Sequence, residues 1–160
     1  MRPLSLLRGA IAAWKSAGTV QIAPSVWIGH GAVIEVDRGG VLEVGARARI
    51  GPGARILVRS GLVQIGAGAE LLERASIVAL EGVTLGADSR LGEMAVVMDF
   101  AAPLQAGVEV PLRTLGVSRA PVSIGAEATI GAKAVIGPGA LVAERAQVLP
   151  GSTVQATAAG

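Results

Sequence analysis

A six-residue unit, aliphatic-Gly-x-x-small-x, recurs along most of the sequence. It is clearest at residues 124–142, IGAEATIGAKAVIGPGALV, where aliphatic-Gly pairs begin at 124, 130 and 136 and alanines stand at 128, 134 and 140. The same phase continues through the chain in groups of three: Ile22, Ile28, Ile34; Val44, Ile50, Ile56; Ile65, Leu71, Ile77; Leu85, Leu91, Val97; Ile124, Ile130, Ile136; Val142, Val148, Val154. Three units therefore predict one turn of a coil, and the groups predict six turns.

A six-residue period fits no helix, but it fits short strands. The apolar and small residues of each unit are separated by an even number of positions, which places them on one face of a strand. We therefore interpret each unit as a strand and a corner, with glycine relieving backbone dihedrals that other residues avoid. No turn buries its inner face alone, so we predict one cooperative all-β domain at residues 19–160.

The composition agrees with a layered core and excludes several classes of protein. The chain is 51% hydrophobic but only 2% aromatic, so many small aliphatic side chains must fill the interior. A net charge of +2 with mixed signs gives no indication of nucleic-acid binding. The absence of cysteine excludes disulfides and thiolate sites and is compatible with a cytoplasmic location. We find no cluster of residues typical of a metal site and no uncharged 18-residue apolar span that predicts a transmembrane segment.

The first 18 residues have a different periodicity. Apolar residues recur there at three- and four-residue spacing: Leu4, Leu7, Ile11, Trp14. This spacing predicts a short amphipathic helix over residues 1–18. We expect the helix to cover the open end of the coil, because terminal units of repeat proteins need a cap. Docking to a membrane surface through Arg2, Arg8 and Lys15 is the alternative.

One long segment interrupts the repeat at residues 99–121. It contains Pro103, Pro111 and Pro121, and it predicts a loop extruded from the coil. Long excursions on compact scaffolds are usually functional, although an arm that serves only assembly has the same appearance. The loop also carries apolar side chains that a neighbouring subunit would cover: Val108, Val110, Leu112, Leu115, Val117.

The repeat resembles that of the left-handed parallel β-helix of hexapeptide acyltransferases, and the resemblance covers residues 20 to 158. The order of the loop, then Pro-Val-x-Ile-Gly, then regular units at 99–137 is similar to that of the sugar and xenobiotic O-acetyltransferases. The resemblance implies a left-handed β-helix of about six turns. It also implies a homotrimer or mixed trimer and acetyl-CoA-dependent acylation of a sugar or glycan hydroxyl.

The catalytic residue that this family uses is missing. Acyl transfer to a hydroxyl needs a base, usually imidazole, and the family places a histidine a few residues after an aspartate where the loop begins. Here Asp99 is followed by Phe-Ala-Ala-Pro, and His30, the sole histidine, lies in the first turn. Two hypotheses remain. The chain is an acyltransferase that uses Asp99 or another carboxylate, Glu93 or Glu109, or positioning alone; or it is a non-catalytic binding or scaffold subunit that partners an active homologue.

The resemblance also implies a site for the acyl donor. Coenzyme A would lie beside the last turns, as a co-substrate and not a permanent cofactor. Its pantetheine amides would meet backbone groups around Ala132, Gly139 and Ala140. Lys133 and Arg145 would meet its phosphates. The alternative for both cations is an ordinary solvated corner.

Overall fold

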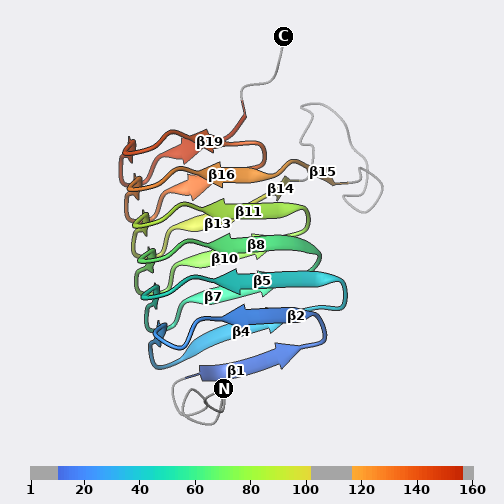
Figure 1. Ribbon diagram of the computed structural model, residues 1–160. Coiled ribbons are helices and arrows are strands. Elements are labelled where there is room, and N and C mark those ends of the chain that lie inside the picture. The colour runs from blue at the N-terminus through green and yellow to red at the C-terminus, as the bar shows by residue number, and fades with distance from the viewer. Residues whose placement is uncertain (1–10, 102–116, 157–160) are drawn as a thin grey trace.

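The protein is a triangular prism of six stacked coils in the computed structural model, which describes residues 11–101 and 117–156 (Figure 1). Each coil contributes one strand to each of three parallel sheets, and β1 adds a seventh strand to sheet A. Sheet A contains β1 (Ile11–Ser16), β4 (Ala32–Val36), β7 (Arg55–Val58), β10 (Ser76–Ala79), β13 (Val96–Met98), β18 (Val135–Ile136) and β21 (Thr153–Val154). Sheet B contains β2 (Thr19–Ile22), β5 (Gly40–Val44), β8 (Gly61–Ile65), β11 (Gly82–Leu85), β16 (Val122–Ile124) and β19 (Leu141–Val142). Sheet C contains β3 (Trp27–Ile28), β6 (Arg49–Ile50), β9 (Glu70–Leu71), β12 (Arg90–Leu91), β17 (Thr129–Ile130) and β20 (Gln147–Val148).

The predicted coil and its register are confirmed. Aliphatic residues of successive coils pair directly, as Ile34 with Ile56 and Ile56 with Ile77 on sheet A. On sheet C, Ile28 pairs with Ile50 in the same way. In Figure 1 the chain crosses the front from right to left on sheet B, turns at the left through sheet C and returns behind on sheet A. It rises as it does so, and a coil that rises in this direction is left-handed.

Aliphatic and alanine side chains fill the inside of the prism. Each aliphatic residue of a unit lies at the centre of a side, and the small residue four positions later lies near a corner. Ala48, Ala54, Ala69 and Ala75 are fully buried, like the isoleucines beside them. The corners of the prism are narrow, which favours a small residue there, and the first coil alone of those described has a valine, Val26, at this position.

The glycine of the unit has a different physical reason from the one that we expected. A Cβ atom on Gly86 would lie 2.3 Å from the backbone N of Ala126 in the next coil, and one on Gly125 would lie 2.5 Å from the N of Glu144. Neither glycine has a positive φ. Positive φ falls two residues later, at Asp88 and Glu127 in these two corners. Close approach of the next coil therefore requires glycine, and strain of the backbone dihedrals does not.

The predicted N-terminal helix is wrong for residues 11–16. These residues form β1, which pairs in parallel with β4 and brings Trp14 beside Ile34. The first edge of sheet A offers unpaired backbone groups, and a strand satisfies them where a helix would not. Residues 1–10, with Arg2 and Arg8, lie outside the described residues. Within the described part of the chain, no helix has the length and apolar character needed to cross a membrane.

The excursion leaves sheet A after β13 and returns to sheet B before β16. Its two ends form a short antiparallel ribbon of β14 (Phe100–Ala101) and β15 (Ser118–Arg119), which we call the stalk. The stalk projects from the corner between sheets A and B (Figure 1). The apolar loop residues lie outside the described residues, except Val117, whose side chain is 48% exposed.

Candidate functional site

Asp99 lies at the base of the stalk, with its side chain inside the prism. It follows β13 at the inward position that Val36, Val58 and Ala79 occupy in the coils before it, and its exposed fraction is 0%. Its carboxylate accepts three backbone hydrogen bonds from the corner of the preceding coil. Leu80 N donates to Oδ1 at 2.8 Å, and the N atoms of Glu81 and Gly82 both donate to Oδ2 at 2.6 Å.

The carboxylate of Asp99 replaces a backbone carbonyl that the excursion removes. In the lower coils the corner N–H donates to the carbonyl directly above it, as Asp37 N does to Val58 O at 2.8 Å. Leu80 N would donate to Asp99 O in the same series, but that carbonyl accepts Ala120 N at 2.9 Å and so closes the stalk. The Asp99 side chain supplies the missing acceptor with charge-assisted bonds. Asp99 therefore anchors the stalk to the coil.

This arrangement leaves little of Asp99 available for proton transfer. A general base must reach the acceptor hydroxyl of the substrate directly or through one water. Both oxygens of Asp99 already accept N–H bonds, and neither faces solvent. The structure thus gives Asp99 a supporting role, and its catalytic role stays a prediction. His30 is exposed on the first coil, as expected, far along the prism from the stalk.

The predicted donor residues lie at three different corners. Ala132 and Lys133 are between sheets C and A, Gly139 and Ala140 are between A and B, and Arg145 is between B and C. Within one chain they do not form one groove. Gly139 and Ala140 alone of this set share a corner with the stalk, and Gly139 N donates to Ala120 O at 3.0 Å.

The backbone groups expected to bind pantetheine already form hydrogen bonds within the coil. Lys133 N donates to Glu93 O at 2.8 Å, and Ala132 O accepts Gly151 N at 2.9 Å. Ala140 N donates to Gly137 O at 3.2 Å. A ligand at these positions would therefore use the second lone pair of a carbonyl or replace a bond within the coil.

The two predicted cations differ in their surroundings. Arg145 is exposed and forms ion pairs with Glu127 at 3.4 Å and Glu144 at 3.2 Å. Lys133 is also exposed, at a corner position with φ of 59°, and within the described residues it has no carboxylate within 4.0 Å. Lys133 is thus the better placed of the two to meet a phosphate.

We call the corner formed by Asp99, Ala120, Gly139 and the stalk the stalk corner. A Cβ atom on Gly139 would lie 3.4 Å from the Cβ of Ala120 and 2.7 Å from the Cβ of Ala156. The stalk, the fifth coil and the end of the described chain therefore meet at one place. Sequence reasoning missed the contribution of Ala120, because its bonds form only when the two ends of the excursion come together.

No protein-family profile matches the sequence, and no curated protein is significantly similar to it. Solved structures do share the fold. Two variants of the perosamine N-acetyltransferase from Caulobacter crescentus, in complex with CoA and GDP-perosamine, superpose with TM-scores of 0.64 and 0.63 at 17% and 16% identity. Both comparisons cover 92% of this chain and 54% of the other chain, so this chain spans about half the length of those enzymes.

A third structure with the fold is AntD, an N-acyltransferase from Bacillus cereus, in complex with dTDP-4-amino-4,6-dideoxyglucose and coenzyme A. Its TM-score is 0.52 at 14% identity, and the match covers 93% of this chain and 75% of that one. The chain therefore has the left-handed parallel β-helix fold that these acyltransferases contain. At such identities the likeness establishes the fold alone.

Proposed function

We propose that this protein is an acetyl-CoA-dependent acyltransferase that acts on a sugar or glycan hydroxyl at the stalk corner. The observation that carries the proposal is the excursion itself, which leaves an otherwise regular left-handed β-helix on an anchored stalk. The similar proteins with bound coenzyme A and an amino-sugar nucleotide support a sugar acceptor. They are N-acyltransferases, so an amino group of a sugar is the acceptor to test beside a hydroxyl.

The reaction requires a group that accepts the proton of the attacking hydroxyl or amine. The acceptor oxygen or nitrogen attacks the thioester carbonyl, the carbon–sulfur bond breaks, and the acceptor proton passes to a base and then to the leaving thiolate. Asp99 is occupied by three N–H groups. We therefore expect slow turnover that relies on positioning. A non-catalytic subunit that pairs with an active homologue is the second candidate, favoured by this occupied carboxylate.

A trimer fits the chemistry of the outer faces. The outer side of sheet A carries aliphatic side chains that are half-buried in the single chain: Leu57, Val78, Val96, Met98, Val135. The outer side of sheet C carries mostly polar residues, including Arg49, Glu70 and Arg90. We propose that neighbouring subunits, of the same or a homologous chain, cover sheet A around the stalk corner. The lack of cysteine agrees with a cytoplasmic location.

The test is an acetyl-transfer assay by mass spectrometry on matched sugars that carry a hydroxyl or an amino group. The wild type should acetylate at least one acceptor slowly. Ala101→His introduces imidazole on β14, two residues after Asp99, and should raise the rate by about a hundredfold if the base alone is missing. Phe100→His, one position earlier on the ribbon, is the control. If neither wild type nor Ala101→His transfers acetyl to any acceptor, the enzyme proposal fails and the scaffold candidate remains.

A further inference from the structure

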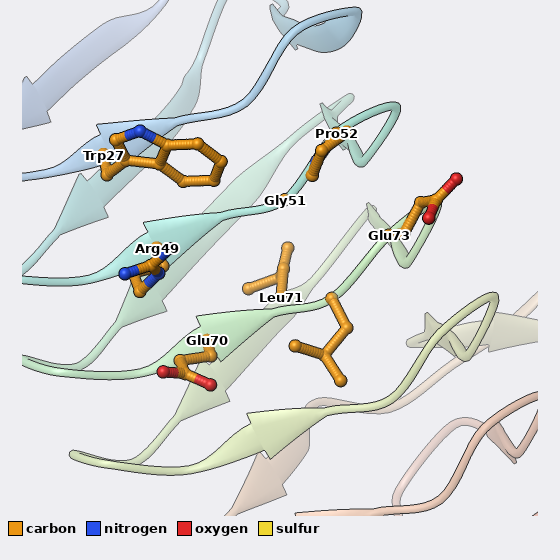
Figure 2. Close-up of a pocket in the computed structure, with 8 residues that line it drawn as sticks. Trp27, Arg49, Gly51, Pro52, Glu70, Leu71 and Glu73 are labelled. Carbon is orange, nitrogen blue, oxygen red and sulfur yellow. The ribbon is translucent and has the colours of Figure 1, made fainter.

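The outer face of sheet C contains a hollow of about 170 Å³ over the first three coils, far along the prism from the stalk corner (Figure 2). The lining includes Trp27 of the first coil, Gly51 of the second and Leu72 of the third. The Trp27 side chain is 47% exposed. Neither the core nor the predicted acyl-transfer site requires an aromatic residue here.

The hollow is formed by two departures from the repeat. At the position of Trp27 the other coils carry polar residues: Arg49, Glu70, Arg90, Thr129, Gln147. At the position of Leu72 the repeat calls for glycine, as at Gly51. A Cβ atom on Gly51 would lie 2.7 Å from Leu71 O, so this position has to remain glycine. Trp27 and Leu72 thus add apolar surface to a lining that is otherwise mostly polar or backbone.

Charged side chains also line the hollow. The Arg49 guanidinium carbon lies 4.8 Å from the centroid of the Trp27 ring, and in the described part of the chain no carboxylate lies within 4.0 Å of it. The Glu70 carboxylate is held by Arg90 at 3.1 Å. Glu73 is exposed at the adjacent corner. The rim therefore offers the donors of Arg49 and the acceptors of Glu70, each of which contacts a neighbouring side chain, and the exposed carboxylate of Glu73.

We propose that this hollow binds one pyranose ring of a glycan or glycoside. A sugar ring has an apolar C–H face that packs on an indole and hydroxyl groups at its edge that bond to carboxylates and guanidinium. The hollow has room for one such ring. A purely apolar ligand would cover the Arg49 guanidinium without giving it a hydrogen-bond partner, which is unfavourable. The site is separate from the stalk corner, and binding there does not depend on acyl transfer.

The test uses the fluorescence of Trp27. The sequence has two tryptophans, so Trp14→Phe leaves Trp27 as the single emitter. Methyl glycosides of glucose, galactose, mannose and N-acetylglucosamine should give, for at least one sugar, a saturable change with a dissociation constant on the order of 1–10 mM. Glycerol, which has hydroxyls but no ring, should give none.

Two leucine variants provide a matched pair. Leu72→Gly restores the residue of the repeat and removes apolar surface from the lining, so it should weaken binding at least tenfold. Leu149→Gly makes the same change at the corresponding position of the last coil, outside the hollow, and should leave binding unchanged. If Leu72→Gly does not fold, Trp27→Thr, which copies Thr129, takes its place with ligand-observed NMR as the readout.

Three results would overturn the proposal. The first is the absence of a saturable change with every glycoside. The second is equal binding by the Leu72→Gly and Leu149→Gly variants. The third is Trp27 emission that shifts with protein concentration, because a second copy of the chain would then cover the hollow.

Discussion

Ser89 places a hydroxyl inside the core, where the neighbouring coils have Ala69 and Ala128. Its Oγ is buried and has no hydrogen-bond partner. Because an unsatisfied buried hydroxyl is costly, Ser89→Ala should raise the free energy of unfolding by about 1 kcal/mol in urea denaturation. Ser123→Ala, at an exposed position of β16, should change it by less than about 0.5 kcal/mol. A loss of stability in the Ser89→Ala variant would show that the hydroxyl has a partner.

Gly86 and Gly82 differ in how closely the next coil approaches them. A Cβ on Gly86 would collide with the backbone of Ala126 at 2.3 Å, whereas the nearest atom to a Cβ on Gly82 is 3.5 Å away. Gly86→Ala should therefore cost about 3 kcal/mol or more, since neither coil can move without breaking the ladder. Gly82→Ala should cost less than about 1 kcal/mol. Equal midpoints in thermal unfolding would contradict this steric explanation.

The repeat predicts the core residues and their register because each inward position has one role in every coil. It does not predict what happens where the repeat stops. The register aligns the side chain of Asp99 with those of Val58 and Ala79. Its carboxylate bonds to Leu80 N because Ala120, at the far end of the excursion, takes the Asp99 carbonyl. No local pattern in the sequence contains that information.

At the scale of elements, the stalk depends on Asp99. Asp99→Asn replaces one acceptor oxygen with an NH2 group that faces backbone N–H groups, at a cost of about 3 kcal/mol. The amides of Leu80, Glu81 and Gly82 should lose protection against hydrogen exchange. Asp37→Asn, whose carboxylate forms an exposed pair with Arg59, is the control and should change little. Unchanged protection of the three amides in Asp99→Asn would contradict the anchoring role.

The N-terminal segment shows the limit of periodicity over a short range. Apolar residues at positions 11 and 14 fit a helix, but Trp14 also packs on the core when residues 11–16 are extended beside β4. The unpaired edge of sheet A favours the strand over the helix, because a strand forms hydrogen bonds with β4. This edge exists only in the folded coil, so the outcome is tertiary and not local.

The spacing of the predicted donor residues already excludes a common corner for them within one chain. Lys133, Gly139 and Arg145 are six residues apart, and six residues advance the chain by one side of the triangle. Residues at this spacing must therefore lie at successive corners. A groove along one corner would instead collect residues about one whole coil apart, such as Ala120 and Gly139.

In the whole molecule, we expect neighbouring subunits of a trimer to cover the outer face of sheet A. Light scattering at micromolar concentration should give about three times the chain mass of 15.9 kDa. Val78→Glu places a charge on the outer side of sheet A and should shift the mass toward one chain, because an unpaired charge in an apolar interface is costly. Thr84→Glu, exposed on sheet B, should keep the trimer. A wild-type monomer would remove the proposed interface.

The proposed acyl transfer requires that the chain binds coenzyme A, and isothermal titration calorimetry measures that binding. Titration should show one site per chain with a dissociation constant near 10 µM, equivalent to about −7 kcal/mol. Lys133→Gln should weaken binding about tenfold, whereas Arg145→Gln should have less effect because Arg145 is already paired with Glu127 and Glu144. Absence of binding by the wild type at millimolar coenzyme A would contradict the account.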